Sequence, residues 1–288
     1  MRRPMIQVVW LVVAVAIVAF IGARAYGQAR WASGTQTLRA GLDAARAPLG
    51  SRTVGFGELA ELPAPVQRFF RAVLREGQPL LTAVHLRHRG TFNMSETAEQ
   101  WKAFTSDQQV VIRRPGFDWD GRIQMFPGVS VHVHDAYVAG EGVLHASLLG
   151  AVTIANLRGG GEIAQGELMR FFAEAAWYPT ALLPSHGVRW SAIDDRSASA
   201  TLVDGALAVT LRFTFHPEGP IDTVYADARA RMVNGALVHA PWRGRFWNHE
   251  VHDGMRVPMD GEVSWLLPEG PKPYWRGHTT DIAFTVAP

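Results

Sequence analysis

Beyond residue 82 the chain is dominated by stretches in which every second residue is apolar, and this period constrains the fold most. The clearest stretch, residues 207–215, has its apolar side chains at Leu207, Val209, Leu211, Phe213 and Phe215. A period of two is that of a β-strand that buries one face. Turn dipeptides separate the stretches at short intervals, as at Pro127-Gly128, Asp204-Gly205 and Asp253-Gly254. We therefore predict strands joined by hairpins, and so a largely antiparallel sheet.

Two segments repeat instead with the period of an α-helix. The first begins near Pro63 and ends before Gly77, and we predict that it packs against the sheet. Its apolar face consists of Val66, Phe69, Phe70, Val73 and Leu74. The second, residues 162–177, is apolar on most sides, so it must be covered on most sides. We predict an α+β fold in which this second helix packs on the concave face of a large, curved, half-barrel-like sheet.

Residues 4–23 form an apolar run whose only polar side chain is Gln7, and arginines stand on both sides of it. About 20 such residues suffice to cross a bilayer as a helix. A cleaved signal peptide is the alternative, because residues 23–25 have the small-x-small form of a cleavage site. The run is longer than the roughly 7–15 residues of a signal core. We therefore predict an uncleaved, single-pass membrane anchor.

These patterns divide the chain into three parts. Residues 1–25 are the N-terminal tail and transmembrane anchor. Residues 26–57 are a juxtamembrane spacer, with a short helix at about 35–45. Residues 58–288 are a single β-rich soluble domain, which we expect on the extracytoplasmic side of the cell membrane. Because arginines flank both ends of the apolar run, charge does not decide the orientation.

The composition removes several classes of function. The chain has no cysteine, which excludes disulfides, thiolate metal sites and a cysteine nucleophile. Its 28 Lys and Arg against 26 Asp and Glu give a net charge of only +2, and no basic run is present that would bind phosphates. The glycine run at 159–161 matches neither phosphate-binding loop. We therefore expect no nucleic-acid partner and no cofactor.

Three charged residues, Glu167, Arg170 and Glu174, share one stripe of the otherwise apolar helix at 162–177. Such neighbours usually form ion pairs on a helix surface. If the stripe instead faces an enclosed cavity, Arg170 would hold an anionic head group between the two carboxylates. The same setting would raise the pKa of a carboxyl group such as that of Glu167, as acid–base catalysis requires.

Ten tryptophans are the most unusual feature of the composition. Either each of them fills the core, or several line one apolar cavity. For a cavity, the expected lining residues are Trp119, Phe172, Trp177, Tyr178 and Trp275. One predicted strand face carries only small residues, namely Val224, Ala226, Ala228 and Ala230. Such a face leaves room for a ligand or for the close approach of a helix.

His132 and His134 stand two residues apart on a predicted strand and therefore point to the same face. With Asp135 or a distant carboxylate they form a candidate metal site. No third ligand stands at a diagnostic spacing, and a solvated sheet face is the alternative, so we predict no metal. The run His249-Glu250-Val251-His252 is not an HExxH motif, and we place it in a hairpin.

Five segments carry a family resemblance: LPAPVQRFF at 62–70, GELMR at 166–170, WYPTALLP at 177–184, DGMRVP at 253–258 and PYWRG at 273–277. From about residue 62 to its end, the chain resembles a bacterial family of uncharacterised membrane-anchored proteins. That family has no assigned activity, so the resemblance transfers no catalytic residue. More distantly, the order of elements is similar to that of periplasmic lipoprotein carriers. That similarity implies a curved antiparallel sheet that is closed by helices and holds acyl chains.

Three functions are compatible with these patterns. In the preferred one, the protein binds a lipid or other hydrophobic ligand in a half-barrel cavity, with Arg170 at the polar end of the ligand. In the second, it is an interaction or structural module at the membrane, with an unknown protein partner and no ligand. In the third, it is a hydrolase or metal-dependent enzyme that uses Glu167 or the pair His132 and His134. We expect a binding protein rather than an enzyme.

Overall fold

The computed structural model describes residues 2–49, 53–95, 97–233 and 235–287. In these residues six strands precede the central helix: β1 (Leu81–Asn93), β2 (Trp101–Val111), β3 (Gly116–Phe126), β4 (Val129–Val138), β5 (Glu141–Leu148) and β6 (Val152–Gly159). Seven strands follow it: β7 (Arg189–Asp194), β8 (Ser197–Asp204), β9 (Leu207–Phe215), β10 (Ile221–Val233), β11 (Ala236–His252), β12 (Met255–Leu267) and β13 (Gly270–Val286).

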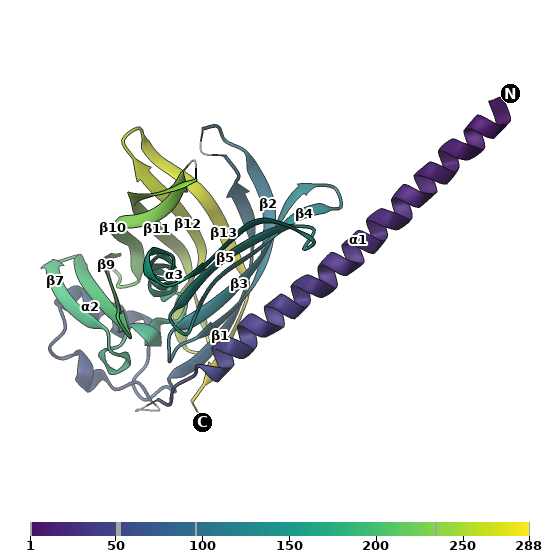
Figure 1. Cartoon of the computed structure of the whole chain (residues 1–288). Helices are drawn as coiled ribbons and strands as arrows, with labels where there is room; N and C mark the ends of the chain where they lie inside the picture. Colours follow the sequence, from purple (N-terminus) through teal and green to yellow (C-terminus); the bar gives the residue numbers. More distant parts are fainter. Residues whose placement is uncertain (1, 50–52, 96, 234, 288) are drawn as a thin grey trace.

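All of these strands belong to one antiparallel sheet. Their order is β6-β5-β4-β3-β2-β1-β13-β12-β11-β10-β9-β8-β7, so nearly every strand pairs with its neighbour in the chain. The sheet curls around a central helix, and within the part of the chain described above its outer strands, β6 and β7, do not pair with each other (Figure 1). The prediction of an α+β fold with a large, unclosed, half-barrel-like sheet is confirmed.

The two blocks of strands join through the first and the last strand. β1 pairs with β13, with Leu86 opposite Ile282 and Gly90 opposite Gly277. A Cβ atom on Gly90 would lie 1.9 Å from the backbone oxygen of Arg276, so only glycine lets the strands approach this closely. The junction makes one continuous surface from the two halves of the domain.

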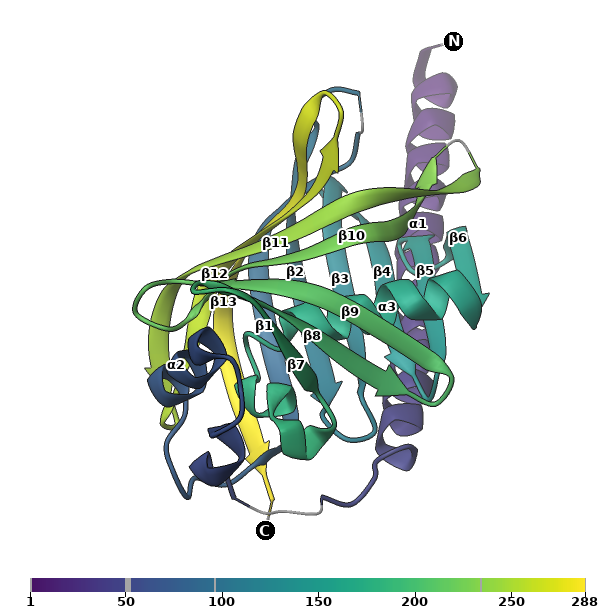
Figure 2. The same cartoon turned by 90° about the vertical axis from the view of Figure 1, so that its left-hand side faces the viewer.

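The helix α3 (Gly161–Glu174) lies on the concave face of the sheet, as predicted (Figure 2). It is buried on most sides, and Phe172 packs against Phe213 of β9 with the ring centroids 5.5 Å apart. Two short 3-10 turns, η2 (Pro179–Leu182) and η3 (Pro184–His186), lead from it to β7. Because α3 occupies the middle of the concave face, any space left for a ligand lies beside this helix.

The second predicted helix, α2 (Ala64–Val73), is also present and follows the short turn η1 (Phe56–Leu59). Pro65 stands in its first turn, where its missing N–H costs nothing. Phe69 and Phe70 are buried, and Phe69 packs against Phe215 with the ring centroids 5.5 Å apart. The apolar stripe of this helix therefore covers part of the sheet, as the sequence predicts.

The N-terminal helix α1 (Arg2–Ala44) is continuous. Within the described residues it is the one helix that is long and apolar enough to cross a membrane. Its apolar window is fully exposed, whereas its C-terminal part lies along the convex face of the sheet (Figure 1). Trp31, with 3% of its surface exposed, and Leu42 are buried there, and Arg24 donates a hydrogen bond to the carbonyl oxygen of Gly128 (2.9 Å).

The helix expected at about residues 35–45 is therefore the end of a much longer one, and part of the expected spacer is packed on the sheet. The contacting residues Gly27, Trp31, Thr35 and Leu42 follow helical spacing but are not uniformly apolar. A Cβ atom on Gly27 would lie 2.2 Å from the carbonyl oxygen of Leu149, so glycine permits close approach. These polar and apolar residues pack against a polar face of the sheet. Because they are not all apolar, the period of apolar residues does not reveal them.

The expected face of small residues on β10 is wrong beyond Ala226. A register shift between Ala226 and Arg229 interrupts the pairing of β10 with β11 and reverses the alternation. Ala228 is consequently exposed, and the buried residues are Arg229 and Arg231. The bulge thus turns two arginines, instead of small side chains, towards the concave face.

Candidate ligand-binding site

Two hollows remain in the concave face beside α3. The outer one has a volume of about 620 Å³ and the inner one about 130 Å³. They adjoin, because five residues line both: Phe92, Asp135, Leu144, Arg229 and Tyr274. The volume of the outer hollow falls in the range of roughly 300–1,000 Å³ that is typical of small-molecule sites.

Aromatic side chains form the walls of the inner hollow, chiefly Trp119, Trp177, Trp242, Phe246 and Trp275. The rings meet in edge-on contacts, such as that of Trp177 with Phe246, whose centroids lie 5.2 Å apart. Trp177 is also tied to the sheet, because its indole N–H donates to the carbonyl oxygen of Pro258 (2.8 Å). The walls are therefore apolar and held in place.

Three of these tryptophans stand two residues before a glycine, at Gly121, Gly244 and Gly277. A Cβ atom on Gly121 would lie 2.2 Å from the Trp119 ring, and one on Gly277 would lie 2.2 Å from the Trp275 ring. The indoles of Trp119 and Trp275 thus occupy the space above a glycine on the same strand face. This Trp-x-Gly pattern is a signal in the sequence that marks the lining of the hollow.

A group of buried charges occupies the junction of the two hollows. The Arg170 guanidinium donates to Glu174 (2.7 Å) and to Asp135, and it lies over the rings of Phe117 and Trp119. Gln108 adds a hydrogen bond to Glu174 (2.6 Å). The stripe of Glu167, Arg170 and Glu174 therefore faces the interior, which is the second of the two arrangements considered from the sequence.

Arg229 lies on the other side of the junction. Its guanidinium donates to the carbonyl oxygen of Gly166 (3.3 Å) and to the hydroxyl of Tyr274 (3.3 Å), and it lies 3.7 Å from Glu167. The Trp242 ring centroid lies 5.3 Å from its central carbon, a distance typical of a cation–π contact. Arg229 therefore forms part of the wall of both hollows.

Two titratable groups on the concave face, Glu167 and His88, are shifted away from their charged forms. Burial and the nearby Asp135 carboxylate raise the pKa of Glu167 well above its ordinary value of 4.5. Burial, with the Arg170 charge second, lowers the pKa of His88 to about 3. The raised pKa favours the protonated form of Glu167, in which its carboxyl group can donate a hydrogen bond.

Several buried polar atoms here have no hydrogen-bond partner among the residues described: Glu167 Oε2, His88 Nε2, and the Nε1 atoms of Trp119 and Trp275. Buried polar groups in folded proteins are nearly always paired with protein or water. Glu167 lines the outer hollow, and both tryptophans line the inner one. Hydrogen-bonding capacity is therefore left over at the site.

The structure brings together most of the residues expected to bind a ligand. Five line the inner hollow, namely Trp119, Arg170, Glu174, Trp177 and Trp275, and Glu167 lines the outer one. Phe172 and Tyr178 line neither. Phe172 faces β9, and the Tyr178 hydroxyl donates to the carbonyl oxygen of Phe171 (2.7 Å), so both belong to the core behind α3.

Sequence reasoning missed other lining residues. Arg229 was hidden by the bulge in β10, and Phe92 and Tyr274 lie on β1 and β13, whose pairing joins distant parts of the chain. Asp135 was considered only as a metal ligand. It stands next to His134, so strand alternation places it on the opposite, concave face.

His132 and His134 lie on the convex face, beneath α1. The His134 ring stacks on Trp31 with the centroids 4.4 Å apart, and its Nδ1 lies 2.7 Å from Asp118. Within the described ranges, no three His, Asp or Glu side chains are grouped to hold a metal. The pair therefore helps to hold the helix on the sheet, and the structure does not support the alternative in which it forms a catalytic or metal centre.

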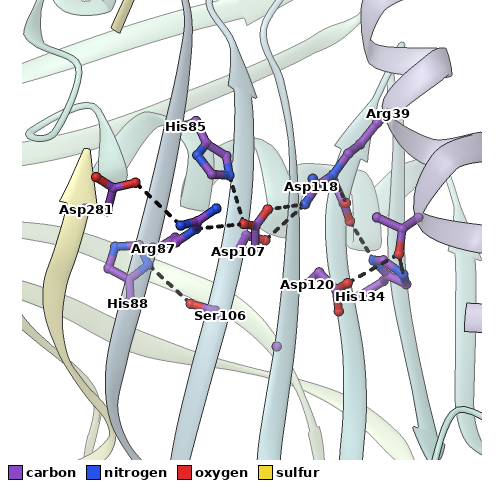
Figure 3. A network of polar contacts seen from close by, with 12 residues as sticks. Arg39, His85, Arg87, His88, Ser106, Asp107, Asp118, Asp120, His134 and Asp281 are labelled. Carbon is purple, nitrogen blue, oxygen red and sulfur yellow. Dashed lines mark hydrogen bonds and ion pairs between the residues drawn. The ribbon is translucent and has the colours of Figure 1, made fainter. Parts of the chain in front are cut away.

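The rest of the convex face is a network of paired charges (Figure 3). Arg39 of α1 bonds Asp107 (2.8 Å) and the fully buried Asp118 (3.1 Å). His85 and Arg87 complete the contacts of Asp107. The Trp31 indole N–H donates to Asp120 (2.9 Å). Asp107, Asp118 and Asp120 are therefore each paired with a group of α1.

Residues 60–284 match a model described as a family of unknown function (DUF6920). A LolA superfamily protein from Nitrosomonas europaea is similar in structure, with 12% identity, a TM-score of 0.33, and coverage of 78% of this chain and 93% of its own.

A β-barrel-like protein of the DUF1849 family from Brucella abortus has 11% identity, a TM-score of 0.17, and coverage of 72% of this chain and 99% of its own. At these values neither structure informs the function of this chain. No curated protein matches it.

Proposed function

The chain belongs to the DUF6920 family of unknown function, and we propose that it is a membrane-anchored protein that binds a lipid or another hydrophobic molecule in the hollow beside α3. The observation that carries this proposal is the pair of adjoining hollows, the inner one walled by tryptophans, with buried polar groups where they meet. Apolar walls with a few convergent polar groups are typical of small-molecule sites. An interaction module without a ligand would need no such space in its core.

The polar groups indicate what the ligand presents to the junction. Arg170 and Arg229 are balanced by Asp135 and Glu174 as long as Glu167 keeps its proton. An ionised group would disturb this balance, whereas a hydroxyl, ester or amide would not. Glu167 has an unpaired oxygen, and the Tyr274 hydroxyl, which accepts from Arg229 and Trp242, has a proton to donate. We therefore expect a neutral hydrogen-bonding group at this point of the ligand.

The apolar window of α1 supports the membrane anchor. It is long enough to cross a bilayer, and none of it is covered by the domain. Exposed apolar residues on a helix of this length are stable in lipid but not in water. In this proposal the helix remains attached, and the domain lies on the extracytoplasmic side.

Native mass spectrometry of the full chain, released from detergent after purification from bacterial membranes, tests the ligand proposal. We expect an adduct of one lipid molecule. The matched variants are Ala173→Leu and Ala173→Gly, because Ala173 of α3 is buried and lines the inner hollow. Leucine fills the hollow and should remove the adduct, whereas glycine leaves it open and should keep it. Equal adducts on both variants, or none on the wild type after incubation with lipid extract, would contradict the proposal.

A further inference from the structure

The course of α1 along the sheet indicates where its apolar part leaves the domain. Leu42 lies against Gly116 at the start of β3, Arg39 bonds Asp118, Trp31 bonds Asp120, and Arg24 bonds Gly128 in the turn after β3. The helix thus runs antiparallel to β3 and passes the β3–β4 turn at Arg24. Its exposed apolar residues lie beyond that point, as Figure 1 shows.

The β3–β4 turn carries an exposed aromatic residue. Phe126 has 66% of its surface exposed, the largest fraction of any large apolar residue in the sheet. The Lys102 ammonium lies 5.8 Å from its ring centroid, and Arg24 of α1 donates to the carbonyl oxygen of Gly128 in the same turn. Tyr26, also exposed, follows on α1. Aromatic rings beside basic groups are typical of the boundary between a bilayer and water.

The same edge of the sheet carries the mouth of the outer hollow. Because neighbouring strands alternate in direction, the β1–β2, β10–β11 and β12–β13 turns lie on the same edge as the β3–β4 turn. Residues next to these three turns line the outer hollow, among them Met94, Leu237 and Lys272. Met94, Met232 and Leu237 line the hollow here and are exposed apolar residues, and they form its rim. Figure 2 shows these hairpins at the end of the domain towards which α1 points.

We infer that this edge of the sheet, with Phe126 and the apolar rim of the hollow, rests on the bilayer that α1 enters, so that the hollow opens towards the membrane and takes its ligand from there. The ligand class is then a membrane lipid rather than a solute. Three separate observations converge on the lipid surface as the partner: the exit point of the helix, the exposed aromatic residue beside cations, and the apolar rim. The inference rests on the proposed membrane anchor.

Site-directed spin labelling of the full chain tests this inference. Because the chain has no cysteine, single cysteines label without background. The positions are Phe126→Cys, Leu237→Cys, Val15→Cys within the apolar segment, and Val251→Cys. Val251 is the matched control, since it has 61% of its surface exposed and lies by the β11–β12 turn on the opposite edge. The protein is reconstituted in phosphatidylcholine vesicles that contain some phosphatidylglycerol.

In vesicles, we expect the labels at 126 and 237 to become more accessible to oxygen and less accessible to a nickel chelate. Their accessibilities should shift towards those of the label at 15. The label at 251 should stay accessible to the nickel chelate. A label at 15 in the bilayer with labels at 126 and 237 that behave like that at 251 would overturn the inference and leave the anchor standing. A label at 15 in water would overturn the anchor, and the inference with it.

Discussion

The two faces of the sheet carry the same kinds of side chain but differ in what covers them. On the convex face, histidines, carboxylates and arginines pair with one another and with Arg39 and Trp31 of the helix α1 that covers them. On the concave face, tryptophans and charges surround space that α3 does not fill. Residue type alone therefore does not identify a site, because the covering element decides whether a polar group is structural or available.

The contrast extends to the hydrogen bonds of the indoles. Trp31, on the convex side, donates to Asp120. Trp119 and Trp275, on the concave side, have no acceptor among the residues described. Buried donors without acceptors cost about 1–3 kcal/mol each. The convex face gains stability from its polar groups, whereas the concave face keeps hydrogen-bonding capacity that a bound molecule would use.

The largest effect should come from loss of the contact between Trp31 of α1 and the convex face of the sheet. Trp31→Ala removes a buried indole, a stacked ring and a hydrogen bond, which we expect to cost about 3–5 kcal/mol of the free energy of unfolding. Urea denaturation in detergent measures the loss, and trypsin should then cut α1 at Arg30 and Arg39. Trp10→Ala is the control, because Trp10 on the same helix is 68% exposed. Equal behaviour of the two variants would show that α1 does not hold to the sheet.

A smaller loss should follow from breaking the network beneath α1. Asp118→Ala leaves Arg39 and the buried His134 without their shared carboxylate. We expect a loss of about 2–3 kcal/mol, less than for a fully buried pair, because 25% of the Arg39 side chain is exposed. Arg87→Ala on the same network should change stability by no more than about 0.5 kcal/mol, because Arg87 is exposed. Thermal unfolding of both variants measures the two losses of stability. Equal losses would show that burial of the carboxylate does not determine the effect.

On the concave face, Gly277→Ala should reduce binding more than stability. The new Cβ would overlap the Trp275 ring and push it towards the inner hollow. We expect the affinity for a neutral dansyl-labelled fatty-acid ester, followed by energy transfer from tryptophan, to fall about tenfold, or about 1.4 kcal/mol. Gly57→Ala is the control, because nothing lies within 4 Å of its Cβ position. An unchanged affinity in Gly277→Ala would show that the position of the Trp275 ring does not affect ligand binding.

The smallest effect should appear in the pH dependence of stability. Because the pKa of Glu167 is raised in the folded protein, that state keeps a proton that the unfolded chain releases above pH 4.5. This contribution to stability is therefore present at acid pH and is lost as the pH rises through the folded pKa, by at most about 1.4 kcal/mol per pH unit.

Glu167→Gln should remove that fall, so its stability relative to the wild type should increase with pH. Urea denaturation from acid to mildly alkaline pH measures it. Glu141→Gln, at an exposed position paired with Arg158, is the control. Parallel pH profiles for the wild type and Glu167→Gln would mean that Glu167 is not held protonated.

Local patterns were sufficient to predict the elements, because strand alternation and helix periodicity are local. The sheet, the helix on its concave face and the family resemblance were all predicted. The pairing of β1 with β13 was not, since it depends on two segments at opposite ends of the domain. The docking of α1 was not predicted either. The residues of α1 that contact the sheet include Gly27, Trp31 and Thr35, which differ in polarity and so form no apolar stripe.

The site followed the same division. The charged stripe of α3 and the tryptophans could be named, because both are conspicuous against an apolar or alternating background. Phe172 and Tyr178 were placed in the cavity wrongly, because a helix that is apolar on most sides does not reveal which side faces the space. Arg229 required knowledge of a single bulge in β10, and no pattern of residue types predicts where a strand gains an extra residue.

The Trp-x-Gly pairs have an evolutionary consequence. Gly121 and Gly277 do not line the inner hollow themselves. Each glycine nevertheless determines how closely the indole of Trp119 or Trp275 can approach the strand backbone. Replacing one of them would narrow the chamber while every residue that touches the ligand stays the same. Relatives of this chain could therefore differ in the size of molecule they accept through positions that a comparison of contact residues would overlook.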